Sequence, residues 1–223
     1  MQPEWKISKS IYIAIGFSQG PLAQSAEQRT FNPWVVGSSP TGPTRERWPE
    51  VYPITTERTL ISPLVIEDLE VFLGYRKDPD VARFQGWDEN YSLEQAKKLI
   101  ESQRGVQFPS EGNWLQLGVR HKSTGQLLGD LALKARPKNV FEIGFTIASS
   151  HQRQGFAKEA ASALVEKLFA NHEARKVLAF TDERNLSSIK TLESIGFVQR
   201  EVKAWQEDFK GERVTVLHFE RAS

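Results

Sequence analysis

The clearest hydrophobic pattern in the chain lies at residues 156–170. Apolar side chains recur there three and four positions apart, at Phe156, Ala160, Ala161, Leu164, Val165 and Leu168. This spacing places them on one face of an amphipathic helix. The four residues before it, 152–155, are polar and end in a glycine. The pattern therefore predicts a helix that begins directly after Gly155.

From Trp48 onward the chain alternates between strand-like and helix-like patterns. Runs rich in β-branched and aromatic residues, separated by turn residues, predict strands at 57–62, 113–120, 126–134, 140–148 and 176–181, with two final strands on either side of Lys210-Gly211. Helices are predicted at 66–76, after a capping box of Ser92 and Gln95, at 156–170 and at 186–194. The order β-αα-βββ-α-β-α-ββ predicts a mixed α/β sheet in a single domain, residues 48–223.

Composition excludes several classes of protein. The 223 residues carry a net charge of +1 and 26% of them are charged, which is typical of a globular protein and leaves no basic footprint for nucleic acid. The absence of cysteine excludes disulfides, thiolate metal sites and a cysteine nucleophile, and it fits a cytoplasmic protein. The four histidines are not spaced as metal ligands, and no apolar run is long enough to span a membrane. We therefore expect no metal, no nucleic-acid partner and no membrane association.

The N-terminal segment differs in character from the rest of the chain. Residues 20–44 are rich in Gly, Pro and Ser, which is typical of a disordered tail. They also resemble a transfer-RNA gene read as protein, because 22–28 can be back-translated to a sequence like a D arm and 36–41 to one like a T stem. Both interpretations predict that residues 1–47 are a non-functional, disordered N-terminal extension.

The glycine before the predicted helix 156–170 suggests an anion site. The first turn of a helix has backbone N–H groups without partners and about half a positive charge, so it attracts phosphates. Gly155 would allow a ligand to approach the backbone closely, and the predicted strand 140–148 leads into the turn. A plain helix cap is the alternative, because one glycine at a helix start is a weak signal.

Three motifs together resemble the GNAT superfamily of acetyl-CoA-dependent N-acetyltransferases, most of all its RimJ/RimL-type branch. They are the turn 152–157, the pair Asn185 and Ser188, and the segment Leu192-Glu-Ser-Ile-Gly-Phe197. The resemblance covers residues 48–223 and implies a GNAT-like α/β (α+β) fold with a mixed, mostly antiparallel sheet flanked by helices. It also implies acetyl-CoA as co-substrate. The residues that match the family's pyrophosphate-binding turn are Gln152, Arg153, Gln154, Gly155, Phe156 and Ala157.

The resemblance implies direct transfer of an acetyl group to a primary amine, without a covalent enzyme intermediate. Such a reaction needs a group to take the ammonium proton and fixed donors for the negative charge on the thioester oxygen. The strand before the turn splays from its neighbour in this family, so a backbone amide near Ile147 would face the thioester. Glu142 on the same strand is the predicted base, acting directly or through water. A solvated or ion-paired strand carboxylate is the alternative.

Asn185 and Ser188 open the predicted helix 186–194, and both residue types are common at helix starts. The resemblance implies that Asn185 binds the pantetheine or orders the site and that Ser188 protonates the leaving thiolate. Many relatives carry an acid tyrosine seven residues after the asparagine, but this chain has Leu192 there. Ser188 or water must then supply the proton.

Acceptor selectivity is expected from the least regular segments, where Trp87, Tyr91 and Trp205 would wall a narrow pocket. Four acidic residues there, Asp88, Glu89, Glu207 and Asp208, either attract a cationic amine or are merely solvated. The acceptor could be a protein N-terminus, a polyamine, an amino acid or an aminoglycoside, and the protein a monomer or a homodimer. A catalytically silent acyl-CoA sensor and a structural partner-binding domain are the alternative functions.

Overall fold

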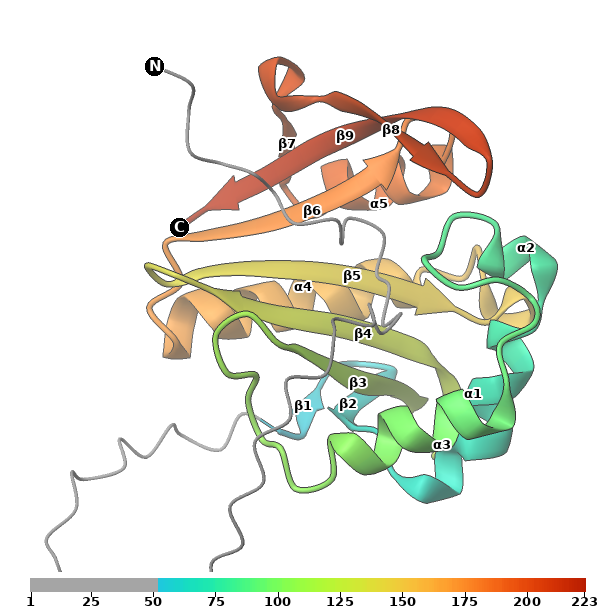
Figure 1. Cartoon of the computed structure of the whole chain (residues 1–223). Helices are drawn as coiled ribbons and strands as arrows, with labels where there is room; N and C mark the ends of the chain where they lie inside the picture. Colours follow the sequence, from blue (N-terminus) through green and yellow to red (C-terminus); the bar gives the residue numbers. More distant parts are fainter. Residues whose placement is uncertain (1–51) are drawn as a thin grey trace, which may run out of the picture.

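The computed structural model describes residues 52–223 (Figure 1). The predictions for residues 1–47 and for the segment 20–44 lie outside this range. The described strands are β1 (Ile54–Thr55), β2 (Thr59–Pro63), β3 (Trp114–His121), β4 (Leu127–Arg136), β5 (Val140–Ile147), β6 (Lys176–Asp182), β7 (Val198–Gln199), β8 (Trp205–Phe209) and β9 (Glu212–Ala222). The described α-helices are α1 (Leu69–Arg76), α2 (Pro79–Ala82), α3 (Leu93–Ser102), α4 (Phe156–Asn171) and α5 (Leu186–Ser194). Three 3-10 helices accompany them, η1 (Ile66–Asp68), η2 (Ser149–His151) and η3 (Glu201–Lys203).

These strands form one sheet in the order β1-β2-β3-β4-β5-β6-β9-β7, and β8 also pairs with β9. Every neighbouring pair is antiparallel except β5 and β6, which run parallel. The prediction of a mixed, mostly antiparallel sheet flanked by helices in a GNAT-like fold is therefore confirmed.

The parallel pair separates partway along its length. Pairing between β5 and β6 ends at Glu142 and Leu178, whereas β5 stays paired with β4 as far as Ile147 and Gly129. The C-terminal half of β5 therefore has a free edge on the side of β6. Such a free edge exposes backbone hydrogen-bonding groups inside the molecule.

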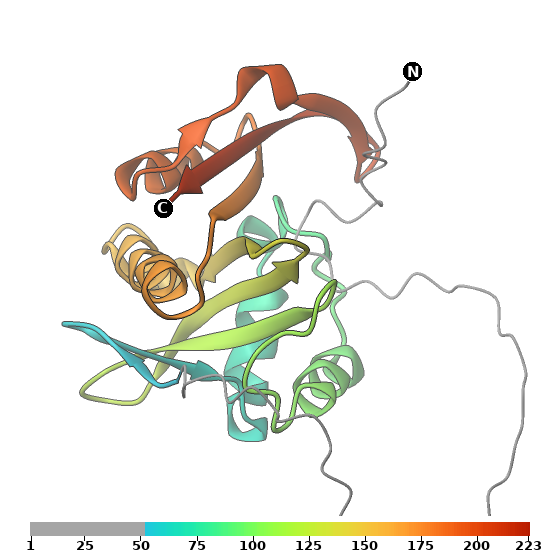
Figure 2. The ribbon, with the colours of Figure 1, turned by 90° about the vertical axis from the view of Figure 1, so that its left-hand side faces the viewer.

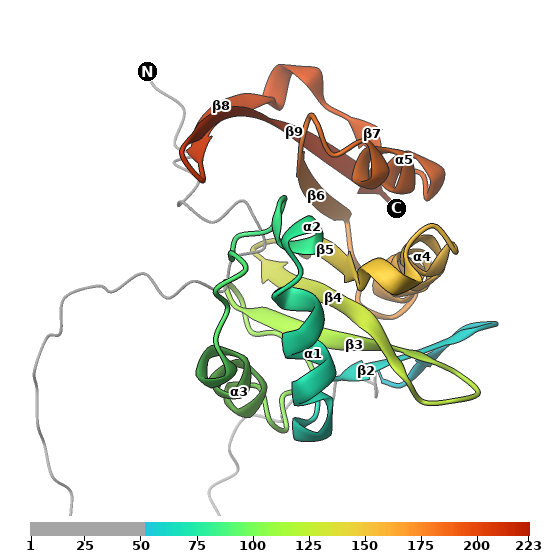
Figure 3. The same ribbon diagram turned by 90° about the vertical axis from the view of Figure 1, so that its right-hand side faces the viewer.

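Helices cover both faces of the sheet, with α4 and α5 on one side and α1 and α3 on the other (Figures 2 and 3). The apolar face of α4 is fully buried against the sheet, where Ala160, Leu164 and Leu168 pack with Ile143 and Val177. Each buried leucine stabilises this layer by about 1.5–3 kcal/mol relative to an exposed position. A second buried cluster fills the space under α1 and α3.

Several local predictions are confirmed. The helix after Gly155 spans Phe156–Asn171, and in the Ser92 capping box the Gln95 amide donates to Oγ of Ser92 at 3.1 Å. The strands β1 and β7 and the helix α2 were not predicted, because two to four residues are too few to show a period. In residues 52–223, no helix is long and apolar enough to cross a membrane.

Candidate active site

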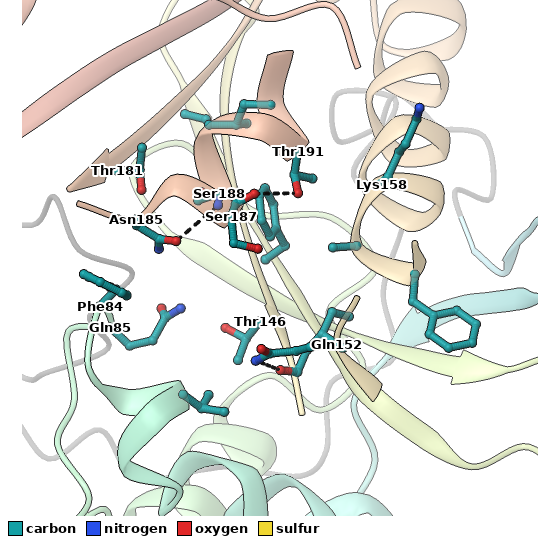
Figure 4. Close-up of a pocket in the computed structure, with 18 of the residues that line it drawn as sticks. Phe84, Gln85, Thr146, Gln152, Lys158, Thr181, Asn185, Ser187, Ser188 and Thr191 are labelled. Atoms are coloured by element: carbon teal, nitrogen blue, oxygen red, sulfur yellow. Dashed lines mark hydrogen bonds between the residues drawn. The ribbon is translucent and has the colours of Figure 1, made fainter. Parts of the chain in front are cut away.

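A cleft of about 300 Å³ lies where β5 and β6 separate. Its walls come from 143–147 of β5, 179–181 of β6, the turn and first residues of α4, the start of α5, and α2 with the loop that follows it. Figure 4 shows side chains from these elements, among them Thr146, Gln152, Asn185 and Ser188, arranged around the space. The cavity that forms where the two strands diverge is therefore lined by both a helix N-terminus and an irregular loop.

The turn before α4 has the geometry of an anion-binding loop. Arg153 and Gly155 adopt positive φ angles of 60° and 83°, and no side chain caps the helix start that Gly155 forms. The first N–H that is bonded back within the helix is that of Glu159, which donates to the carbonyl of Gly155 at 3.0 Å. The amides of the first turn therefore have no helical partner, and residues 155–158 line the cleft, which is an arrangement that binds phosphate. These residues fit a pyrophosphate.

Arg58, in the turn between β1 and β2, braces this loop from outside the cleft. Its guanidinium donates from Nη1 to the carbonyl of Gln154 at 3.0 Å and from Nε to Oε2 of Glu159 at 2.7 Å. Burial favours a higher pKa for Glu159, but hydrogen bonds from Thr56 and Arg58 outweigh it and lower the pKa. The carboxylate therefore stays ionised and keeps the brace. No pattern in the sequence indicated this contact, because its partners are about a hundred residues apart.

Ile147 ends β5 beside the turn. The next amide, that of Ala148, donates to the Leu128 carbonyl of β4 at 2.9 Å. Successive amides of a strand point to opposite sides, so the N–H of Ile147 points away from β4 and toward the free edge. Its carbonyl accepts a hydrogen bond from Nε2 of Gln152 at 2.9 Å. The turn is thereby fixed to the strand, and the amide of Ile147 is left facing the side of the cleft.

Asn185 and Ser188 both line the cleft at the start of α5. The Asn185 side chain caps the helix, because its Oδ1 accepts the Ser188 amide at 3.1 Å (Figure 4). Asn185 thus fulfils the ordinary capping role, and a contact with pantetheine stays a prediction. Leu192 lines the cleft one turn further along. The hydroxyl of Ser188 is one of three on this helix that line the cleft, with those of Ser187 and Thr191, and its role as a proton donor stays a prediction.

Glu142 does not line the cleft, and its side chain is only 3% exposed. It lies at the last position where β5 pairs with β6. Its carboxylate forms an ion pair with Arg136, which donates to Oε2 from Nε at 2.7 Å and also from Nη2. Burial raises the pKa of Glu142, and the neighbouring Arg136 opposes this shift. The contacts of Glu142 are therefore those of an ion-paired strand carboxylate, which was the alternative to a catalytic base. Its role as a base stays a prediction.

The three aromatic residues predicted to wall the acceptor pocket lie outside the lining of this cleft, and their contact with an acceptor stays a prediction. Trp87 and Tyr91 are 7% and 4% exposed and lie outside the cleft, where their rings pack around the buried guanidinium of Arg76 at 3.7 and 5.1 Å. Aromatic faces stabilise a desolvated cation, which explains why they are turned inward. Trp205 is also outside the cleft lining, but it packs at 5.5 Å against Phe180, which does line it.

Sequence reasoning missed several residues of the cleft. These residues are Asp80, Val81, Thr146, His151, Lys158, Ala179, Phe180, Thr181, Ser187 and Thr191. Phe84 and Gln85, in a loop that was expected to select the acceptor, are among the lining residues (Figure 4). Alternation along β5 could have indicated Thr146, since it shares a face with Glu142. In residues 52–223 no cluster of three or more His, Asp or Glu side chains could hold a metal ion.

Comparisons with known proteins agree with this architecture. Residues 58–198 match the sequence model of the acetyltransferase (GNAT) domain. The chain is 25% identical over 166 residues to the uncharacterized N-acetyltransferase p20 of Bacillus licheniformis, covering 74% of this chain and 92% of that protein.

Two solved structures with the same fold contain coenzyme A. Spermidine N-acetyltransferase from Vibrio cholerae, in complex with CoA and spermine, superposes with a TM-score of 0.65 at 16% identity over 75% of this chain and 96% of that one. RimL, a ribosomal L7/L12 alpha-N-protein acetyltransferase in complex with CoA, gives a TM-score of 0.63 at 17% identity over 76% and 96%. With the family match over more than half of the sequence, this chain belongs to the GNAT family and is an acetyl-CoA-dependent N-acetyltransferase.

Proposed function

We propose that the protein transfers the acetyl group of acetyl-CoA directly to a primary amine, either of a small molecule or of a peptide N-terminus. The observation that carries this proposal is the cleft at the divergence of β5 and β6, with the N-terminus of α4 at one end and the α2 loop at the other. Two reactants could meet there at the free edge of β5. The chain has no cysteine nucleophile, which is consistent with a transfer that needs no covalent intermediate.

The residues around the cleft suit the two tasks of binding and charge stabilisation. Acetyl-CoA, when bound, supplies an activated acetyl thioester. The amides after Gly155 would hold its pyrophosphate, and Gln152 keeps the turn attached to β5. The N–H of Ile147 would donate to the carbonyl oxygen as negative charge develops on it, which is the role of an oxyanion-hole donor.

Two further side chains would move protons. Glu142 would take the ammonium proton through water, because its carboxylate is held by Arg136 and does not reach the cleft wall. Thr146 shares its face of β5 and lines the cleft, so water beside Thr146 would form the path. Ser188 would protonate the departing thiolate.

Two measurements test the proposal. Acetyl-CoA at a hundred times its dissociation constant should stabilise the fold by about 2.7 kcal/mol, seen as a rise in melting temperature. Thiol release with a panel of polyamines, amino acids, aminoglycosides and peptides should then identify a turned-over amine. Binding of acetyl-CoA without turnover of any amine would instead favour an acyl-CoA sensor, a function with which the ion pair of Glu142 is compatible. No thermal shift would contradict both.

A further inference from the structure

Lys210 connects the β8–β9 hairpin to the loop after α2, two segments that are far apart in sequence. It lies at the tip of the β8–β9 hairpin, and its Nζ donates to the carbonyl of Ala82 at 2.8 Å and to that of Trp87 at 2.5 Å. These carbonyls flank the loop that carries Phe84 and Gln85 into the cleft. The hairpin tip and the α2 loop lie on the same side of the molecule (Figures 1 and 3).

The contact has the chemistry of a specific bridge. A charged ammonium forms stronger hydrogen bonds to carbonyls than a neutral donor does. The turn is shaped to present it, because Lys210 and Gly211 both have positive φ, at 49° and 81°. Desolvation lowers the pKa of Lys210, while Asp88 and Glu89 oppose that shift. The two hydrogen bonds to Ala82 and Trp87 hold the ammonium at the α2 loop.

A second bridge joins the other end of α2 to β5. Asp78 caps α2 by accepting the Asp80 amide at 3.0 Å, and its second oxygen accepts the hydroxyl of Ser149 at 2.5 Å. Ser149 begins η2, directly after β5 and Ala148. The helix α2 is thus held at both ends, by Ser149 on one side and by Lys210 on the other.

The remaining connections are backbone pairs. The hairpin continues into β9, which pairs with β6 from Asp182 to Lys176, and β6 pairs with β5 up to Glu142. Arg184 strengthens the hairpin side, since it donates to Asp182 at 2.7 Å and to Glu212 at 2.5 Å. The chain of contacts from β5 through η2, α2, the hairpin, β9 and β6 therefore returns to β5.

We propose that Lys210 is a specificity-determining residue that closes this ring around the acceptor end of the cleft. The inference rests on the proposed function, because it assigns the end lined by Val81, Phe84 and Thr146 to the acceptor. A ring cannot open sideways as a groove can. An acceptor must therefore enter end-on, which selects a primary amine on an unbranched chain. Within the proposed function it excludes amines that are branched close to the nitrogen, among them most peptide N-termini.

The absence of cysteine allows a test that does not depend on knowing the acceptor. Thr146→Cys places a single thiol on the cleft wall. Its labelling rate is measured with a linear and a branched alkyl methanethiosulfonate of equal carbon number. Saturating desulfo-coenzyme A, which lacks a thiol, occupies the other end. The same measurement is made after adding Lys210→Met, Lys210→Arg or, as a matched control on the same hairpin, Arg213→Met.

We expect the linear reagent to react faster with Thr146→Cys alone, and Lys210→Met to raise the branched-to-linear rate ratio at least about tenfold. Lys210→Arg and Arg213→Met should leave the ratio unchanged. The first keeps a cation at the tip, and within residues 52–223 the ion pair of Arg213 is with Asp208 on the same hairpin. A ratio near one before mutation, or no change with Lys210→Met in a folded protein, overturns the ring. Failure of desulfo-coenzyme A to raise the melting temperature is a separate result, and it overturns the proposed function and this inference with it.

Discussion

Arg58 and Glu159 form an ion pair of 2.6 Å that joins the β1–β2 turn to the start of α4. The same arginine donates to the carbonyl of Gln154, so it fixes the loop that we assign to the pyrophosphate. Its guanidinium also lies 4.7 Å from the ring of Phe156. The brace contacts the turn through the carbonyl of Gln154 and the side chain of Glu159, so it does not use the backbone amides of the first turn.

Arg58→Met is therefore expected to weaken acetyl-CoA binding several-fold while changing the melting temperature little. The loop would lose its fixed position, whereas an exposed ion pair contributes less than about 1 kcal/mol to stability. Isothermal titration with acetyl-CoA measures the effect. Lys97→Met is the control, since it breaks the exposed Lys97–Glu101 pair on α3, away from the cleft. Equal affinity in both variants would contradict the brace.

Gly155→Val should abolish detectable acetyl-CoA binding in a protein that still folds. The position has a φ of 83°, and an added Cβ would lie 3.3 Å from Nη2 of Arg58, so both the backbone and the brace would shift. Gly112→Val is a matched control because Gly112 has the same φ and no atom within 4 Å of an added Cβ. Both variants should lose similar stability, measured by urea unfolding. Binding lost equally in Gly112→Val would show that strain alone is responsible.

Glu142→Gln tests the proposed base. The amide keeps the shape of the side chain but cannot accept the proton, so turnover at neutral pH should fall at least about a hundredfold with acetyl-CoA affinity unchanged. Part of the loss should return at high pH, where free amine is abundant. Glu220→Gln provides a control, because Glu220 is also a buried, ion-paired carboxylate but lies outside the cleft. Turnover within a few-fold of wild type for Glu142→Gln would leave water as the base.

His218 should make the fold less stable as the pH falls. Burial and the nearby Lys203 lower its pKa from 6.5 to about 4, and Glu220 only partly opposes this. The unfolded chain then binds a proton that the folded protein does not, so stability is lost as the pH drops from about 6.5 toward 4. The groups facing His218 are Lys203, Lys176, Arg136 and Glu220.

Urea unfolding at several pH values checks this expectation, with His218→Gln as the comparison. The variant should lose less stability between pH 6.5 and 4 than the wild type. Glu220 makes the stability depend on pH in a lower range. Its pKa is lowered from 4.5 to about 2, so the stability that its ionised form contributes is lost as the pH falls from about 4.5 toward 2. An unchanged slope in His218→Gln between pH 6.5 and 4 would show that another group titrates there.

The sequence by itself determined the elements whose cause is local. The 3.6-residue period of α4, the start of this helix directly after Gly155 and the Ser92 capping box are set by neighbouring residues, and the structure has each of them. The succession of strands and helices followed from the same periods and turns. Together with the turn at 152–157, it led to the family.

Only the tertiary structure decided which segments meet. The separation of β5 from β6 after Glu142, the brace of Arg58 on Glu159 and the bridge of Lys210 to the α2 loop each join residues that no local pattern links. Trp87 shows the same limit, because an aromatic residue suits a binding pocket and a core equally well. The guanidinium of Arg76, at the end of α1, is buried and lies over the Trp87 ring. Because an aromatic face stabilises a cation that has lost its water, the ring is turned inward.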